Sequence, residues 1–352
     1  MKKHFTLFCL ILCLSAHAVE FQSVNVENFI RETWNPQTVI LDVRTLSEYT
    51  EGHLAGAVLA DFKAEDFIWQ VEQQIPTNKR IAVYCRTGKR SKEAAGLLVE
   101  KGYIVTELDG GIVAWQAAKK RIVKGSPSDI ERYAAHSYQA NKQFAVAYRD
   151  TQVGEKDGDI LVVYLHSGSA CGIDNELPVR QRALGLLVDY LETEHINACV
   201  LVPQCRIDRR WNEYRPMQGC VMSEALYGLI HQYIKEHPAK DVYIVGESFG
   251  GAGVWRMLSD YPKMFSGGML VASYPLKNVK PKNISKTPLC VVLGELDERA
   301  GTDKTEPVVK EIQQQRNSNV RYVVMQGADH YTTCSNAFSQ ENLGWLFTQS
   351  RQ

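Results

Sequence analysis

Two short stretches of the sequence carry nucleophilic side chains in surroundings that could activate them. In CRTGKRS, residues 85–91, Cys85 ends an apolar run. Three cations follow it within five residues: Arg86, Lys89 and Arg90. In GESFGG, residues 246–251, Ser248 stands in a turn rich in glycine. Cations favour the thiolate, which is the nucleophilic form of cysteine, and a serine becomes a nucleophile beside a histidine base. The sequence therefore points to two separate covalent chemistries.

The residues around Cys85 predict a strand that turns directly into a helix. RIAVYC, residues 80–85, is apolar and β-branched, and helical spacing begins near Ser91. Backbone N–H groups of residues 86–91 can converge on one point, where the helix N-terminus adds positive potential. A lone cysteine that ends an apolar strand is more often structural. The loop pattern spans several residues, and it favours an active thiol that holds an anion at sulfur.

Partners for Ser248 occur later in the chain in the order that a serine hydrolase needs. GESFGG follows the strand-like DVYIV and precedes a helical stretch, which is the context of a nucleophile on a sharp turn. Asp297 and His330 each come just past a later strand candidate, and the carboxyl ends of parallel strands meet at one sheet edge. We predict Ser248 as nucleophile, His330 as base and Asp297 as acid. Glu295 is the rival acid, and Asp329 is too close to His330 along the chain to orient its ring.

The loop that follows the strand LVVYLH is the candidate oxyanion hole. Its small residues include Ser167 and Gly168. The backbone N–H of Gly168, or that of Ser167, could meet a developing oxyanion together with the backbone N–H of Phe249. Each such donor lowers the barrier by roughly 3 kcal/mol.

Strands alternate with helices twice along the chain, on two scales. This rhythm predicts a small α/β domain with a largely parallel sheet, followed by a doubly wound sheet covered on both faces. Strands are expected at 38–45, 80–85, 104–111, 159–166, 198–204, 241–246, 267–273, 289–294 and 320–326, with helices at 91–103 and 223–237. The predicted parts are a signal peptide, a small domain, a polar linker and lead-in, and a large domain: 1–18, 19–123, 124–157 and 158–352.

The N-terminus predicts export. Lys2 and Lys3 precede an apolar run that is too short to span a bilayer, and Ala18 ends a small-x-small exit. We expect cleavage after Ala18, no membrane anchor, and a periplasmic or secreted protein. The formal net charge of zero gives no indication of nucleic acid binding. The histidines lack metal-ligand spacing, so we predict no metal and no cofactor.

The cysteines fit an oxidising compartment. Two of the nine lie in the predicted signal peptide. The other seven suggest one functional thiol and up to three bridges, whose connectivity the sequence leaves open. Cys205 and Cys220 flank a polar loop of about 15 residues and are one candidate pair. Two unrelated buried thiols are the alternative.

Residues 20 to 120 resemble the rhodanese family. CRTGKRS matches its active-site pattern, and LDVRTLSEYTEGHLAGA (41–57) and LDGGIVAW (108–115) look like its other two markers. The resemblance implies that Cys85 takes sulfane sulfur from a small-molecule donor, carries it as a persulfide and passes it to a nucleophilic acceptor. It implies that Asp42 and Arg44 brace the loop and that His53 is a structural hydrogen-bonder. Four residues separate Cys85 from Arg90, whereas phosphatases with a similar loop have five.

From residue 158 onward the chain resembles α/β-hydrolases of the secreted peptidase/esterase type. The features LH…G…DNE, LVPQC…RW, GESFGG and DH fall in the order of that group. Ser167 stands where the group usually has glycine, and Phe249 stands where it usually has a smaller residue or methionine. The resemblance implies an ester or peptide substrate, and a carboxylic ester is the more favoured of the two. Two other hypotheses are a rhodanese unit that only docks or binds anions, and a degenerate hydrolase that serves as a scaffold.

Overall fold

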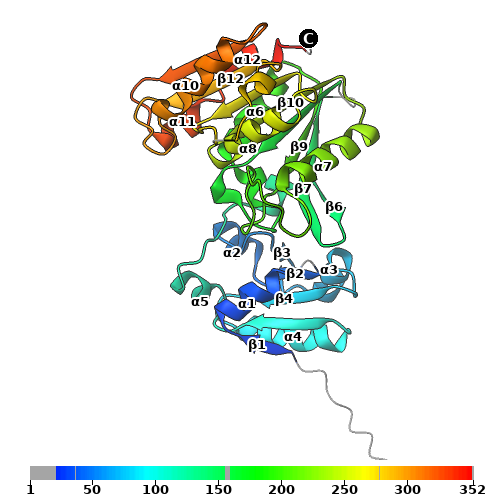
Figure 1. Ribbon diagram of the computed structural model, residues 1–352. Coiled ribbons are helices and arrows are strands. Elements are labelled where there is room, and N and C mark those ends of the chain that lie inside the picture. Colours follow the sequence, from blue (N-terminus) through cyan, green and yellow to red (C-terminus); the bar gives the residue numbers. More distant parts are fainter. Residues whose placement is uncertain (1–20, 36, 155–158, 277, 351–352) are drawn as a thin grey trace, which may run out of the picture. The chain divides into compact units, whose positions relative to one another are not determined.

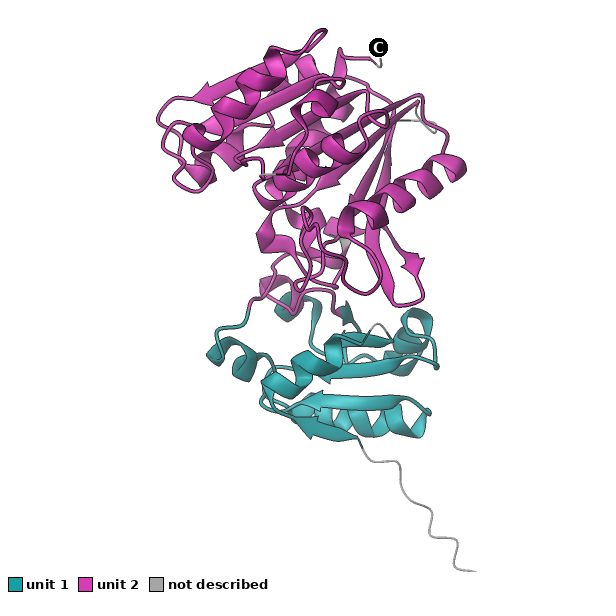
Figure 2. Cartoon of the chain, in the orientation of Figure 1, with its two compact units in different colours: residues 1–48, 58–120 teal, residues 49–57, 121–352 magenta. Residues whose placement is uncertain are grey.

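The computed structural model describes residues 21–35, 37–154, 159–276 and 278–350 (Figure 1). The predicted signal peptide lies outside the described residues. The chain divides into two compact units (Figure 2). The smaller unit comprises residues 1–48 and 58–120, and the larger comprises residues 49–57 and 121–352.

The smaller unit is built on a five-stranded sheet in which every pairing is parallel. The strands, in sheet order, are β1 (Gln22–Val24), β5 (Ile104–Leu108), β4 (Arg80–Tyr84), β2 (Thr38–Asp42) and β3 (Val58–Leu59). The helices are α1 (Val26–Thr33), α3 (Phe67–Gln74), α4 (Lys89–Glu100) and α5 (Gly111–Ala117), and α2 (Leu46–Glu51) crosses the boundary between the units.

The core of the smaller unit fixes the position of Cys85. Val71 of α3 and Leu98 of α4 are fully buried against Leu41 of β2 and Val83 of β4. Cys85 belongs to this same core, directly after β4. The strand therefore delivers the thiol to the carboxyl edge of a parallel sheet, where α4 begins.

The larger unit contains an eight-stranded sheet. The strands, in sheet order, are β13 (Val320–Met325), β12 (Leu289–Gly294), β11 (Gly267–Val271), β10 (Asp241–Glu247), β8 (Ile160–Leu165), β9 (Ala198–Pro203), β7 (Phe144–Val153) and β6 (Ala134–Asn141). The first six run parallel to one another, and β7 and β6 are antiparallel to their neighbours.

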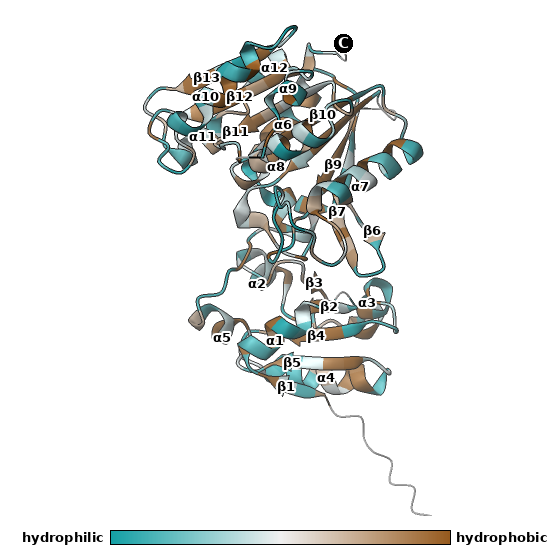
Figure 3. Cartoon of the chain, in the orientation of Figure 1, coloured by the Kyte–Doolittle hydropathy of each residue, from teal (hydrophilic) through white to brown (hydrophobic). Residues whose placement is uncertain are grey.

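Helices cover both faces of this sheet. They are α6 (Arg182–Thr193), α7 (Met222–Glu236), α8 (Phe249–Asp260), α9 (Pro281–Ile284), α10 (Thr302–Gln313), α11 (His330–Asn336) and α12 (Gln340–Phe347). Alternate residues of β8 serve the two faces, because Leu161 and Val163 join the core under α7, α8 and α10, whereas Val162 and Tyr164 join the core under α6 and α12. The strands accordingly stand out as apolar in Figure 3. Such two-sided burial is typical of a doubly wound sheet.

The expected α/β architecture is confirmed, and all nine predicted strands overlap observed strands. The predicted linker is wrong for residues 134–153, which form the hairpin of β6 and β7 at the edge of the large sheet. Phe144, Val146 and Tyr148 are buried at alternate positions of β7, while β6 is largely exposed. The polar outer strand explains why the stretch reads as a linker.

Across the described residues, no helix is both long and apolar enough to cross a bilayer.

Candidate active sites

The sulfur of Cys85 is buried and accepts two hydrogen bonds. Cys85 is only 1% exposed. The backbone N–H of Gly88 lies 3.2 Å from its Sγ, and the hydroxyl of Ser91 lies 3.3 Å from it. Gly88 has a left-handed backbone, with φ at 98°, and this turns its N–H inward just before α4. One backbone N–H of the predicted loop and one side-chain hydroxyl near the start of α4 therefore converge on the sulfur.

The three cations near Cys85 do not form a ring around its sulfur. Arg86 and Lys89 are exposed. Arg90 forms a two-pronged pair with Glu48, with Nη1 to Oε2 at 2.8 Å and Nη2 to Oε1 at 2.7 Å. This hydrogen bonding lowers the pKa of Glu48 to about 2 and raises that of Arg90. Glu48 thus fixes the orientation of the Arg90 guanidinium.

Asp42 and Arg44 lie where they can support the loop. The guanidinium of Arg44 donates to Asp42 Oδ2 at 2.6 Å, and the Tyr84 hydroxyl donates to the same oxygen at 2.6 Å. Asp42 is fully buried at the end of β2, and Tyr84 immediately precedes Cys85. The pair therefore holds the end of β4 in place.

Two further features of this site escape sequence reasoning. Glu107 is fully buried and accepts from the Ser91 hydroxyl at 2.7 Å and from the Ser23 hydroxyl. Gly111 packs so closely on the loop that a Cβ there would stand 2.5 Å from the carbonyl oxygen of Cys85. A buried acid in a strand has no local sequence signal. The GG pair of LDGGIVAW is the signal for the close contact.

His53 takes part in a buried hydrogen-bond network of the larger unit. It is fully buried, with Nδ1 2.9 Å from the carbonyl oxygen of Tyr49 and Nε2 3.0 Å from Glu176 Oε1. Glu176 Oε2 also accepts from the backbone N–H of Gly56 at 2.7 Å. These contacts fit the structural role that the sequence suggests for His53.

Ser248 stands on a strained turn between β10 and α8. Its φ is 50° and its ψ is −113°, a conformation that costs a non-glycine residue free energy. The turn requires the glycines around it, because a Cβ on Gly250 would lie 1.8 Å from the carbonyl oxygen of Leu165. The Ser248 side chain is thereby presented at the carboxyl edge of the sheet.

Ser248, His330 and Asp297 form a hydrogen-bonded series. Ser248 Oγ is 2.9 Å from His330 Nε2, and His330 Nδ1 is 2.8 Å from Asp297 Oδ2. The other carboxylate oxygen of Asp297 accepts from the backbone N–H groups of Arg299 and Ala300, both at 2.9 Å. Asp297 is 3% exposed. An ionised carboxylate can only accept, so the proton of the imidazole lies on Nδ1 and leaves Nε2 free to accept from the serine.

The two rival acids take other roles. Glu295 accepts from the backbone N–H of Gly327 at 2.8 Å. Asp329 caps α11 by accepting from the N–H of Thr332 at 2.8 Å. Of the three acids, Asp297 is the one whose carboxylate is hydrogen-bonded to the His330 ring among the described contacts.

The candidate oxyanion donors separate into two groups. The N–H of Ser167 is directed to Gln181 Oε1 at 3.3 Å, and the Ser167 hydroxyl donates to the same oxygen at 2.7 Å. Gly168 begins the short helix η2 (Gly168–Ala170), and Phe249 begins α8. The first N–H groups of a helix have no partner within that helix. A Cβ on Gly168 would touch the Phe249 side chain at 3.6 Å, so the geometry favours Gly168 with Phe249 over Ser167.

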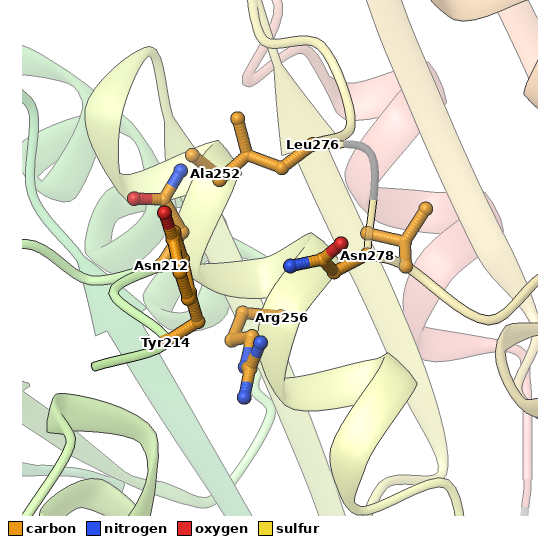
Figure 4. Close-up of a pocket in the computed structure, with 7 residues that line it drawn as sticks. Asn212, Tyr214, Ala252, Arg256, Leu276 and Asn278 are labelled. Carbon is orange, nitrogen blue, oxygen red and sulfur yellow. The ribbon is translucent and has the colours of Figure 1, made fainter. Parts of the chain in front are cut away.

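A pocket lies along α8, beginning four residues after Ser248. It is lined by Asn212, Tyr214, Ala252, Arg256, Leu276, Asn278 and Val279 (Figure 4). Two carboxamides, a guanidinium and a phenol ring face apolar groups there. Arg256 is ion-paired with Asp260 at 2.6 Å, so the pocket offers polar groups with little net charge.

The predicted pairing of Cys205 with Cys220 is wrong in this structure, where all seven described cysteines are free thiols. The thiol of Cys205 is instead hydrogen-bonded to that of Cys171. Cys220 interacts with Arg209, which also donates to its carbonyl oxygen at 2.8 Å. Two cysteines that flank a loop need not face each other, because their side chains follow the backbone direction at each end.

No group of three His, Cys, Asp or Glu is arranged to hold a metal ion in the part of the chain that the structure describes.

The part of the chain that contains Cys85 matches a known domain family. Residues 25–118 match the family described as the rhodanese-like domain. This part of the chain is a rhodanese-like domain. A tRNA uridine(34) hydroxylase of Bacillus velezensis is 35% identical over 112 residues, which are 30% of this chain and 34% of that protein. One of Shouchella clausii is 41% identical over 101 residues, 27% of this chain and 30% of that protein. The chain spans about a third of the length of these curated relatives, and the match corresponds to the rhodanese-like domain.

The larger unit is similar in fold to a solved esterase structure. The structure of a thermostable esterase aligns with a TM-score of 0.57 and 23% identity, over 65% of this chain and 66% of that chain. The predicted α/β-hydrolase fold is thereby confirmed for the larger unit.

Proposed function

We propose that the larger unit is a serine hydrolase that acts on carboxylic esters. The observation that carries the proposal is the hydrogen-bonded series of Ser248, His330 and Asp297. It stands on the strained turn that presents Ser248, and Ser248 and His330 are both partly exposed. A substrate can therefore reach the nucleophile and its base.

In this proposal His330 Nε2 takes the proton of Ser248 as Oγ attacks the carbonyl carbon of the ester. Asp297 stabilises the resulting imidazolium, and its second oxygen is kept in place by two backbone donors. The N–H groups of Gly168 and Phe249 stabilise the oxyanion. His330 then gives its proton to the leaving alcohol, and water hydrolyses the acyl-enzyme by the same route.

A panel of short-chain aryl esters, carbohydrate esters and peptide amides tests this proposal on the mature protein. We expect ester hydrolysis and labelling of Ser248 by a fluorophosphonate probe, with both lost in Ser248→Ala. Failure of the folded wild-type protein to label would refute the hydrolase and would favour the degenerate scaffold.

We further propose that Cys85 of the rhodanese-like domain transfers sulfane sulfur. The buried thiol with converging donors from Gly88 and Ser91 supports this function, since those donors stabilise a thiolate or a persulfide anion. The Cys85 thiolate attacks the outer sulfur of a donor such as thiosulfate and releases sulfite. A nucleophilic acceptor then takes that sulfur from the persulfide and restores the thiolate.

Thiocyanate formation from thiosulfate and cyanide distinguishes sulfur transfer from a docking role. We expect thiocyanate formation with the wild-type protein and none with Cys85→Ser.

The hydroxylase activity in the names of the curated relatives belongs to proteins that this chain matches over about a third of their length, and it is not part of this proposal. Export, with cleavage after Ala18, remains part of the proposal, and N-terminal sequencing of the secreted or periplasmic product tests it.

A further inference from the structure

Cys205 lies where both ends of the oxyanion segment meet. We define the oxyanion segment as residues 166–171, from His166 to Cys171. At its first residue, His166 Nε2 accepts from the backbone N–H of Cys205 at 2.9 Å. Just past its last residue, the N–H of Gly172 donates to the carbonyl oxygen of Cys205 at 3.0 Å. One residue of the loop after β9 therefore holds both ends of the segment that carries Gly168.

The side chains at this point add a third contact. The thiols of Cys171 and Cys205 are hydrogen-bonded to each other. The neighbouring side chain of Gln204 donates to the carbonyl oxygen of Ala170 at 2.9 Å, which keeps the two backbones side by side. Both cysteines belong to or pack against the same apolar core. The two thiols thus lie within hydrogen-bond reach of each other on adjacent segments, and proximity of the two sulfurs is the first requirement of a disulfide.

The two thiols differ in the way that attacking and resolving thiols differ. Cys171 is partly exposed, whereas Cys205 is fully buried. The hydrogen bond from Cys205, assisted by the charges of Arg121 and Arg210 and opposed by burial, lowers the pKa of Cys171 below its ordinary value. Burial, and then the hydrogen bond and charge of Cys171, raise the pKa of Cys205 well above the ordinary value. Cys171 is the accessible nucleophile of the pair.

We propose that Cys171 and Cys205 form a redox site, whose disulfide closes the oxyanion segment onto the loop after β9. The oxidant is a small or protein disulfide, for which glutathione disulfide is the probe. The Cys171 thiolate attacks one sulfur of glutathione disulfide, breaks its S–S bond and releases one glutathione. The Cys205 thiolate then attacks Cys171 Sγ and releases the second glutathione. The two thiol protons pass to the two released thiolates, so two thiols are oxidised and one disulfide is reduced.

Oxidation has a defined structural consequence. In the dithiol form the end of the oxyanion segment is held by hydrogen bonds and apolar packing without a covalent link, and Gly168 lies three residues before Cys171. The disulfide replaces the contact between the thiols by a covalent bond at the residue that also anchors His166. The link to catalysis rests on the proposed hydrolase, because only there does Gly168 act as a donor. The existence of the bond does not depend on that function.

Peptide mapping without reduction tests the bond on the full-length protein. After treatment with glutathione disulfide and alkylation of the remaining thiols, we expect a peptide in which Cys171 is linked to Cys205. The matched control is Cys220→Ser, which should keep this linkage, whereas Cys171→Ser should lose it. Alkylation of both Cys171 and Cys205 in the treated wild-type protein, or a linkage of Cys205 to Cys220, would overturn the proposal.

Two further measurements read the consequence. The oxidised wild-type protein should melt several degrees above the form reduced with dithiothreitol, and Cys171→Ser should show no such difference. Labelling of Ser248 by the fluorophosphonate probe should slow several-fold on reduction of the wild-type protein and stay constant in Cys171→Ser. Equal labelling rates in the presence of the mapped disulfide would overturn the effect on the oxyanion segment and leave the redox site standing. A protein that never labels would refute the hydrolase alone.

Discussion

Replacement of Asp297 by asparagine should reverse the proton positions on His330 without removing a side chain. One oxygen of Asp297 accepts from two backbone N–H groups, those of Arg299 and Ala300. An asparagine that turned its NH2 toward these donors would leave both unsatisfied, at a cost of about 1–3 kcal/mol each. The single hydrogen bond regained at His330 is worth about 1 kcal/mol. The asparagine therefore keeps its oxygen on the backbone donors and directs its NH2 at His330.

An NH2 group that faces Nδ1 selects the wrong tautomer. Nδ1 then accepts, the proton moves to Nε2, and His330 cannot take the proton of Ser248. A change of this kind lowers kcat by about 10⁴-fold, which corresponds to about 5.5 kcal/mol of barrier. The assay is hydrolysis of a short-chain aryl ester by Asp297→Asn, with circular dichroism to confirm the fold.

Glu295→Gln is the matched control for this experiment. Glu295 binds the N–H of Gly327 through one oxygen, and a glutamine keeps that acceptor, so its activity should stay within about twofold of wild type, under about 0.5 kcal/mol. Retention of more than a tenth of wild-type kcat by Asp297→Asn would refute the tautomer argument. A large loss in Glu295→Gln would mean that the acid has been misassigned.

Three further predictions concern separability and pH. Cys85→Ser should abolish thiocyanate formation and leave ester hydrolysis within about twofold, whereas Ser248→Ala should do the reverse; a tenfold loss of hydrolysis in folded Cys85→Ser, about 1.4 kcal/mol, would mean that the sites are coupled. Because Arg90 lowers the pKa of Glu48 to about 2, that pair should stabilise the fold above pH 4.5 and lose its effect as the pH falls toward 2. Urea unfolding of wild type and Glu48→Gln should therefore differ at pH 6, and the difference should be much smaller at pH 2.5. Burial lowers the pKa of His166 to about 4. As the pH falls from about 6.5 to 4, His166 is therefore protonated in the unfolded state before it is protonated in the folded state, and the free energy of unfolding should fall. His166→Gln should remove this contribution to the pH dependence of the free energy of unfolding.

The strands that the sequence predicts most directly are those whose side chains are buried on both faces of the sheet. β8 to β12 are buried on both faces, and each appears as a continuous, largely apolar run. The outer hairpin fails this criterion, because β6 is a polar edge strand and every second residue of the first half of β7 is only partly buried. Edge strands commonly carry polar side chains that discourage further pairing. Such a strand can be recognised only through its partner.

The candidate sites show the same division. Ser248, Asp297 and His330 each follow a strand, and local context therefore places them at one edge. Cys171 and Glu107 reach their partners through contacts that no local pattern encodes. The pairing of Cys171 with Cys205 depends on how two separate loops leave β8 and β9. Long-range proximity of that kind is a property of the assembled sheet, so it is absent from any short stretch of the sequence.

The grouping of residues 49–57 with the larger unit has a consequence for the order in which the chain can fold during synthesis. His53 finds its hydrogen-bond partner Glu176 at a separation of 123 positions. At ribosomal rates of about 5–20 residues per second, that partner emerges roughly 6–25 s after the histidine. Until then the imidazole and the N–H of Gly56 lack their native acceptor. The larger unit therefore cannot be completed by a chain that begins after residue 57, and the native state of that unit depends on a segment that the ribosome delivers first.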